Sequence, residues 1–191
     1  MLDVLGALAG LLAMAPLMLV AAIAIRLDTR GPALFRQVRV GRHGQPFQML
    51  KFRTMVQDAE SLKDALVERN QAQDGLFKIG DDPRITRVGR LLRRTSLDEL
   101  PQLLNVLRGD MSLVGPRPLI LAEDRLMLGW RRERLELTPG MTGPWQILGP
   151  TRASLSEMAS IDCRYAADWS LGSDIKILLH TALHVVSRRG L

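Results

Sequence analysis

Residues 95–118 read TSLDELPQLLNVLRGDMSLVGPRP, and the rest of the chain is organised around this stretch. Its apolar residues follow the spacing i, i+3, i+4 and i+7: Leu100, Leu103, Leu104 and Leu107. This spacing predicts a short amphipathic helix with one face against a core. Gly109 ends the pattern, because glycine readily leaves the helical conformation.

The start of this predicted helix has two alternatives. Ser96 and Glu99 form a capping-box pattern, but Pro101 would then lie beyond the first turn. We favour Asp98 as the N-cap, because Pro101 then falls within the first turn, where its missing N–H costs nothing. In either case the two carboxylates lie where the helix dipole and the free N–H groups favour anions, including a bound phosphate.

Arginine surrounds these two carboxylates. The residues that precede them include Arg84, Arg87, Arg90, Arg93 and Arg94. Arg117 follows in a turn made rigid by Pro116 and Pro118, and guanidinium groups suit bidentate binding of phosphate. Taken locally, Asp98 could be a simple helix cap and Glu99 a solvated surface residue. Between arginines, and in a chain with a membrane segment, they indicate chemistry on a phosphorylated substrate at a membrane, with an ionised carboxylate as nucleophile.

Composition narrows the class of partner. The chain has 191 residues and a formal net charge of +6, which suits an anionic membrane surface, a nucleotide-sugar or a nucleic acid. Aromatic residues make up 4% and do not interleave with the basic ones, so we expect no nucleic-acid partner. Cys163 is the only cysteine, which excludes an intramolecular disulfide and a cysteine-based zinc site.

Residues 4–25 contain no charged side chain. As a helix they would be about 33 Å long, enough to cross a bilayer. Pro16, near the middle, predicts a kink or a break. A kinked span and a re-entrant hairpin both fit, and the residues alone favour the span. Basic residues crowd the far end and predict a cytoplasmic location for the remainder: Arg26, Arg30, Arg36, Arg39 and Arg42.

The next two segments, residues 33–40 and 46–52, have the pattern of short strands, which predicts a β-hairpin. The hairpin would deliver Lys51 and Arg53 to one of its ends, although charges of this kind also occur on solvated strand edges. A surface helix without a role in chemistry is expected over residues 57–72.

Further helices are predicted at residues 88–92, 119–137 and 175–186. Residues 74–83 are expected to form a mobile loop able to act over a site, because glycine and proline punctuate them. Residues 138–150 are also rich in glycine and proline and predict a loop that serves a ligand or a closely approaching element, with a purely structural loop as the alternative. His180 and His184 continue the polar stripe of the last helix and are not expected to bind metal.

These motifs together resemble the bacterial sugar transferase family, the monotopic phosphoglycosyl transferases. The resemblance rests on the apolar segment with its proline, followed in order by RGPALFRQVRVGRHGQPFQMLKFRTM, DPRITRVGRLLRRTSLDELPQLLNVLRGDMSLVGPRP and TPGMTGPWQ. It covers essentially the whole chain, and several motifs in the right order are specific. It implies transfer of a sugar-1-phosphate from a UDP-sugar to polyprenyl (undecaprenyl) phosphate with release of UMP. This would be the first membrane step of bacterial glycan assembly, at the cytoplasmic face of the inner membrane.

The resemblance also implies a two-step covalent mechanism. Asp98 matches the family's nucleophile, which becomes a phosphosugar-aspartate, and Glu99 matches the glutamate used around Mg²⁺. Arg93 and Arg117 match arginines near the bound phosphate. Less well-defined motif positions add further substrate-binding candidates at Lys51, Arg53 and Arg84.

The fold that the resemblance implies is mixed α/β and mainly helical. Residues 1–27 would form a re-entrant helix-break-helix in the membrane, which replaces the span favoured above. Residues 28–191 would form a cytoplasmic catalytic domain with a short β-hairpin and amphipathic interfacial helices. Ala15 stands before Pro16 where the family often has serine, and the usual basic residues before the apolar segment are missing. The chain is therefore expected to be a natural short form or the catalytic part of a longer membrane protein.

Two rival functions remain. One is direct transfer without a covalent intermediate. The other is a non-catalytic, membrane-anchored basic adaptor that binds acidic partners or lipid through its arginines, with strong salt sensitivity. The adaptor hypothesis leaves the adjacent carboxylates and the arginine-flanked turn unexplained. The sequence names neither the sugar nor the glycan pathway, and it leaves a homodimer open.

Overall fold

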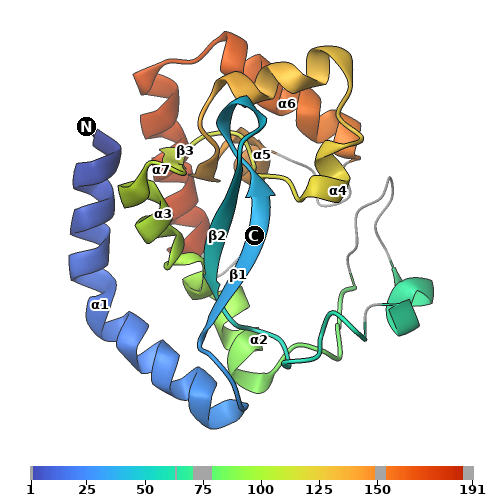
Figure 1. Cartoon of the computed structure of the whole chain (residues 1–191). Coiled ribbons are helices and arrows are strands. Elements are labelled where there is room, and N and C mark those ends of the chain that lie inside the picture. The colour runs from blue at the N-terminus through green and yellow to red at the C-terminus, as the bar shows by residue number, and fades with distance from the viewer. Residues whose placement is uncertain (1, 63, 71–78, 149–153, 187–191) are drawn as a thin grey trace.

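The computed structural model describes residues 2–62, 64–70, 79–148 and 154–186, except the side chains of residues 184–186. In chain order, with η for 3-10 helices, the elements are α1 (Leu2–Asp28), β1 (Leu34–Val40), η1 (Arg42–Gly44), β2 (Pro46–Phe52), η2 (Asp64–Arg69), α2 (Arg87–Arg94), η3 (Leu97–Glu99), α3 (Gln102–Arg108), β3 (Ser112–Val114), α4 (Leu121–Asp124), η4 (Gly129–Glu136), β4 (Gly140–Thr142), α5 (Pro144–Leu148), α6 (Leu155–Ala167) and α7 (Leu171–Val186). Figure 1 shows helices arranged around one long hairpin, so the predicted class, mixed and mainly helical, is confirmed.

Helix α1 is 27 residues long and changes direction about midway along its length (Figure 1). Pro16 lies there and removes a ladder hydrogen bond, which accounts for the bend. The helix is long and apolar enough to cross a bilayer. One face is exposed and apolar, with Leu5, Leu8, Leu12, Leu19, Val20 and Ile23. On the other face Ala7 packs against α3 and β2, and Ala21 and Ile25 pack against Phe52.

Polar contacts tie both ends of α1 to the body of the protein. Near the first end, the Asp3 carboxylate accepts hydrogen bonds from Ser112 Oγ at 2.9 Å and from the Leu113 N–H at 3.0 Å. At the other end, Asp28 Oδ2 accepts a hydrogen bond from the Val88 N–H at 3.2 Å. Buried small side chains between these points hold the helix against the same body.

Strands β1 and β2 pair antiparallel, in register from Leu34 opposite Phe52, which confirms the predicted hairpin. The first strand begins one residue later than predicted. Asn105 of α3, which is fully buried, occupies the outer edge of β2. Its Nδ2 donates to the Gln48 carbonyl at 2.7 Å and its Oδ1 accepts from the Leu50 N–H at 2.9 Å. The helix that follows the two carboxylates is thereby fastened to the hairpin.

Strands β3 and β4 form a small parallel pair. The backbones approach very closely there, since a Cβ atom on Gly140 would lie 2.0 Å from the nitrogen of Gly115. Gly115 N–H donates to the Thr142 carbonyl at 2.9 Å, and Gly140 N–H donates to the Pro116 carbonyl at 3.0 Å. The loop predicted at residues 138–150 contains β4 and α5, and its last two residues lie outside the described part of the chain. Its glycines permit the close approach of another element, as expected for a loop that serves a ligand or a neighbouring element.

The start of the central helix differs from both predictions. Helix α3 begins at Gln102, and Asp98 lies in the separate turn η3. Ser96, which precedes η3, has a left-handed backbone (φ 54°) and makes no side-chain cap. The chain therefore turns sharply between α2 and η3, and neither Ser96 nor Asp98 caps α3. Pro101 occupies the N-cap position instead.

Two predicted helices are wrong in extent. Residues 119–137 are divided into α4 and η4, because Leu128 is extended and Gly129 has a left-handed backbone (φ 60°). In the described part of residues 57–72, turns and η2 replace the predicted surface helix. The apolar stripe there is too narrow to be buried, and Leu62 remains 44% exposed.

The other predicted segments can be stated briefly. Helices α2 and α7 confirm the helices predicted at residues 88–92 and 175–186, and each begins earlier than predicted. The loop predicted at residues 74–83 falls partly outside the described residues, up to residue 78.

Close packing of α2 on the end of β2 gives a stability prediction. A Cβ atom on Gly89 would lie 2.0 Å from the Thr54 carbonyl oxygen, a backbone atom that cannot give way cheaply. We expect Gly89→Ala to lower the free energy of unfolding by about 3 kcal/mol, through overpacking. The measurement is thermal unfolding in detergent. Gly172→Ala is the control, because its nearest neighbour is 3.9 Å away and alanine favours a helix. Equal melting temperatures for Gly89→Ala and wild type would contradict the close approach.

Candidate active site

The two adjacent carboxylates lie at the end of the hairpin where β2 meets η3. Lys51 Nζ of β2 donates to Glu99 Oε1 at 2.7 Å, and this ion pair is partly exposed. Asp98 beside it is only 9% exposed. Burial raises the pKa of Asp98, the charge of Glu99 raises it further, and Lys51 and Arg93 oppose the rise. The site therefore holds one buried carboxylate beside a second carboxylate and two cations.

Arg93 reaches this site from the last turn of α2. Its Nε donates to Thr54 Oγ1 at 2.8 Å, just beyond the end of β2. The Thr54 carbonyl in turn accepts from the Thr86 N–H at 3.0 Å, which holds the start of α2. Thr54 therefore holds the Arg93 side chain, whose charge lowers the pKa of Asp98. The sequence places Thr54 at this end of the hairpin, within the motif that ends KFRTM, but its role was not predicted, because that role follows from the packing of α2 on β2.

Arg39 of β1 holds the turn that carries Arg117. Its side chain is 12% exposed, and its Nη1 donates to the Pro118 carbonyl at 3.0 Å. The pKa of Arg39 is lowered to about 10 by burial and by the charge of Arg117, against the opposing effects of Glu123 and Glu99. Arg39 therefore lies within electrostatic reach of both Arg117 and Glu99. The sequence indicates Arg39 only as one of the basic residues that mark membrane orientation, so this position of Arg39 was not predicted.

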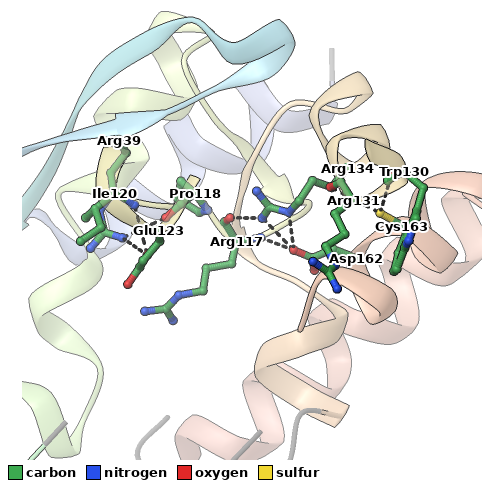
Figure 2. A network of polar contacts seen from close by, with 10 residues as sticks. All are labelled: Arg39, Arg117, Pro118, Ile120, Glu123, Trp130, Arg131, Arg134, Asp162 and Cys163. Atoms are coloured by element: carbon green, nitrogen blue, oxygen red, sulfur yellow. Dashed lines mark hydrogen bonds and ion pairs between the residues drawn. The ribbon is translucent and has the colours of Figure 1, made fainter. Parts of the chain in front are cut away.

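The backbone of Arg117 is fixed by hydrogen bonds, whereas its side chain forms none with the described residues. Its N–H donates to Asp162 Oδ2 at 3.3 Å, and its carbonyl accepts from Arg134 Nη2. Figure 2 shows the Arg117 guanidinium pointing away from these contacts. Among the described residues it has no hydrogen bond or ion pair, and the residue is exposed. The guanidinium is thus available to an anion.

Two predicted substrate-binding residues have partners elsewhere in the fold. The Arg53 guanidinium donates to the carbonyl of Thr29 at 2.9 Å and to that of Arg30, just beyond the end of α1. Arg84 Nη2 lies 2.7 Å from Asp82 Oδ2, and both side chains are buried. The structure brings Lys51, Arg93, Asp98 and Glu99 together, whereas Arg53 and Arg84 hold loops. Their assignment to substrate stays a prediction.

The carboxylates suit a magnesium ion that arrives with phosphate. Among the described residues, no group of three or more His, Cys, Asp or Glu side chains could hold a metal ion. Glu99 Oε1 is engaged by Lys51, and among the described contacts Oε2 has no partner. Magnesium is commonly held by one or two carboxylates together with substrate phosphates and water. Glu99 Oε2 with Asp98 close by fits that mode and does not fit an all-protein site.

Comparison with known proteins places this chain in a family. A model of the family described as bacterial sugar transferase matches residues 1–188. The chain belongs to this family. The relatives include the galactosyl transferase CpsE of Streptococcus agalactiae serotype III, 46% identical over 181 residues, which are 94% of this chain and 40% of the relative. The UDP-glucose:undecaprenyl-phosphate glucose-1-phosphate transferase of Caulobacter vibrioides is 47% identical over 87% of this chain and 61% of its own length.

A third relative, the exopolysaccharide production protein ExoY of Sinorhizobium fredii, is 39% identical over 98% of this chain and 85% of its own length. The chain therefore spans about two fifths of the streptococcal relative and most of ExoY. The family resemblance predicted from the motifs is confirmed.

Asp98 is expected to lower the stability of the folded protein at neutral pH. A raised pKa means that the folded state binds a proton more tightly than the unfolded state. The stabilisation by protonation is complete below the ordinary carboxyl pKa of about 3.9 and is lost as pH rises through the folded-state pKa. Asp98→Asn removes the ionisation with nearly the same shape. We expect a higher melting temperature than wild type at pH 7 and a smaller difference as pH falls.

The measurement is thermal unfolding of both proteins between pH 7 and pH 5. Asp81→Asn is the matched control, since the Asp81 side chain is 91% exposed and its ion pair with Arg90 is loose, at 3.6 Å. It should melt with wild type at every pH. A destabilised Asp98→Asn protein at pH 7, or a difference that does not change with pH, would contradict the burial argument.

Proposed function

We propose that the protein transfers a sugar-1-phosphate from a UDP-sugar to polyprenyl phosphate through a phosphosugar-aspartate on Asp98, with release of UMP. The observation that carries the proposal is a buried carboxylate with Lys51 and Arg93 near it, where a phosphate could be received. The name of the Caulobacter relative, which specifies UDP-glucose and undecaprenyl phosphate, supports the same substrate classes here.

The proposed reaction has two displacements at phosphorus. A carboxylate oxygen of Asp98 attacks the phosphorus that bears the sugar, the bond to the UMP oxygen breaks, and UMP leaves with the electron pair. A phosphate oxygen of the polyprenyl phosphate then attacks the same phosphorus and frees Asp98. A carboxylate nucleophile divides one difficult transfer into two easier steps. Lys51 and Arg93 would neutralise charge that spreads over the phosphoryl oxygens.

Glu99 is proposed as the magnesium ligand, through Oε2. Lys51 holds the other oxygen at 2.7 Å and so orients the carboxylate. Magnesium, when bound, would neutralise the phosphates of the donor. Arg117, whose guanidinium has no partner among the described residues, would bind a phosphate oxygen of the donor.

We also propose that α1 is re-entrant, at the cytoplasmic face of the inner membrane. In a spanning helix, Asp3 and Asp28 would be separated by a hydrocarbon layer of about 30 Å. Instead, Asp3 accepts hydrogen bonds from Ser112 and Leu113, and Asp28 accepts one from Val88 of the same body. The bend and the exposed apolar face of α1 suit a helix that enters one leaflet and returns (Figure 1).

The covalent mechanism predicts an adduct that can be weighed. Purified protein mixed with Mg²⁺ and a panel of UDP-sugars, without lipid acceptor, should gain the mass of one sugar-phosphate in intact-protein mass spectrometry. Asp98→Asn should form no adduct and lose at least about a thousandfold in turnover, because its amide is not a nucleophile. Its melting curve shows whether it is folded. Omission of Mg²⁺ should prevent the adduct in wild type.

Other results separate the rival functions. UMP release that requires the lipid acceptor, without any adduct, would indicate direct transfer. Salt-sensitive binding of anionic vesicles that is unchanged in Asp98→Asn, with no UMP release from any donor, would indicate the adaptor.

The re-entrant topology predicts that both ends of α1 are labelled from the same side. In a Cys163→Ser background, single cysteines at Leu2 and at Arg30 can be treated with a membrane-impermeant maleimide. Both should react in inverted inner-membrane vesicles and be protected in intact spheroplasts. Labelling of the Leu2→Cys protein from the outside, with the Arg30→Cys protein protected, would establish a span instead.

A further inference from the structure

We infer that the buried ion pair of Arg134 and Asp162 positions Arg117 for phosphate binding by holding its backbone from both sides. The inference rests on the proposed function, in which Arg117 binds a substrate phosphate. Neither member of the pair would touch substrate. Each acts through the peptide groups of the turn formed by residues 115–118, which we call the arginine turn.

The pair joins two elements that are distant in sequence. Arg134 of η4 places Nη2 at 2.8 Å and Nε at 3.2 Å from Asp162 Oδ2 of α6. The side chains are 1% and 0% exposed. The same Asp162 oxygen accepts the Arg117 N–H at 3.3 Å, and the same Arg134 nitrogen donates to the Arg117 carbonyl. Figure 2 shows the peptide groups of Arg117 enclosed by this pair.

The rest of the arginine turn is held in the same way. In β4, the Thr142 carbonyl accepts from the Gly115 N–H, and the Gly140 N–H donates to the Pro116 carbonyl. The Pro118 carbonyl accepts from Arg39 Nη1 at 3.0 Å. Pro116 and Pro118 have no N–H to satisfy. The backbone is therefore fixed by directional contacts, while the Arg117 guanidinium has no partner among the described residues. A fixed backbone under a free cationic side chain reduces the entropy lost when an anion binds.

Stability alone does not explain a charged pair at this place. Buried ion pairs can often be replaced by apolar residues of similar volume without loss of stability. An apolar pair would fill the space but leave the N–H and carbonyl of Arg117 without partners. Asp162 Oδ1 is itself buried without a hydrogen bond from any described residue, so the carboxylate is not arranged for its own solvation. The contacts it does make are those that orient Arg117.

The test is a double-mutant cycle on phosphate affinity, with inorganic pyrophosphate as the probe. Calorimetric titration of the full chain in detergent compares wild type, Arg117→Ala, Asp162→Asn and the double variant. We expect the dissociation constant to rise about fivefold or more in each single variant. The double variant should bind no more weakly than Arg117→Ala, because a residue that acts through Arg117 has nothing left to orient.

Controls separate positioning from stability. Met158→Ala on α6, one turn before Asp162, opens a cavity in an adjacent core cluster and should lower the melting temperature while leaving pyrophosphate affinity unchanged. If Asp162→Asn does not fold, Arg134→Lys is carried through the same cycle, since lysine keeps the charge but cannot donate in the same fork.

Three results would overturn the inference: equal affinity of wild type and Arg117→Ala, unchanged affinity of Asp162→Asn, or losses that add in the double variant. Binding and turnover are measured separately. Coupled pyrophosphate binding in a protein that releases no UMP would therefore support the positioning pair and contradict the proposed function.

Discussion

The hydrogen bonds of the buried Asn105 side chain to the outer edge of β2 are the constraint on which the site depends. They fix the position of α3 along the strand, and η3 directly precedes α3. Asn105 accepts a hydrogen bond from the N–H of Leu50, and Lys51 is the next residue of β2. The Asn105 contact therefore brings this part of β2 close to η3, where Lys51 pairs with Glu99. A buried amide that satisfies two backbone groups tolerates little sliding, because each group left without a partner costs about 1–3 kcal/mol. The position of both carboxylates relative to the hairpin follows from it.

The candidate site contains a carboxylate in an environment that disfavours its charge. Asp98 is buried beside another carboxylate, which raises its pKa and opposes ionisation in the folded state. Such a group would be unfavourable in a purely structural role, and functional sites are where proteins retain arrangements of this kind. The neighbouring cations come from two other elements, Lys51 from β2 and Arg93 from α2. The charges of Lys51 and Arg93, from two other elements, therefore offset part of the free energy lost when the Asp98 carboxylate is buried.

Helix α1 has two possible membrane arrangements, a span and a re-entrant helix, which its composition leaves open. Its residues alone favour a span, because they are apolar for long enough to cross a bilayer. The contacts of Asp3 and Asp28 with one body favour the re-entrant arrangement that the family resemblance implies. The matched region spans about two fifths of the streptococcal relative, so this unit also occurs within longer family members.

The sequence by itself determined the local features: the hairpin, the apolar helix with its proline, the two carboxylates, and the guanidinium-rich surroundings that suit phosphate. These depend on periodicity and residue type over a few positions. Only the tertiary structure decided which arginine serves which purpose. Arg53 holds the chain just beyond the end of α1, Arg39 holds the Pro118 carbonyl of the arginine turn, and Arg134 pairs with Asp162, 28 positions away. The helices misjudged at residues 57–72 and 119–137 have the same explanation. The partner of a buried charge, and the face that a weak helix can bury, are set by chain segments that meet only when the protein folds.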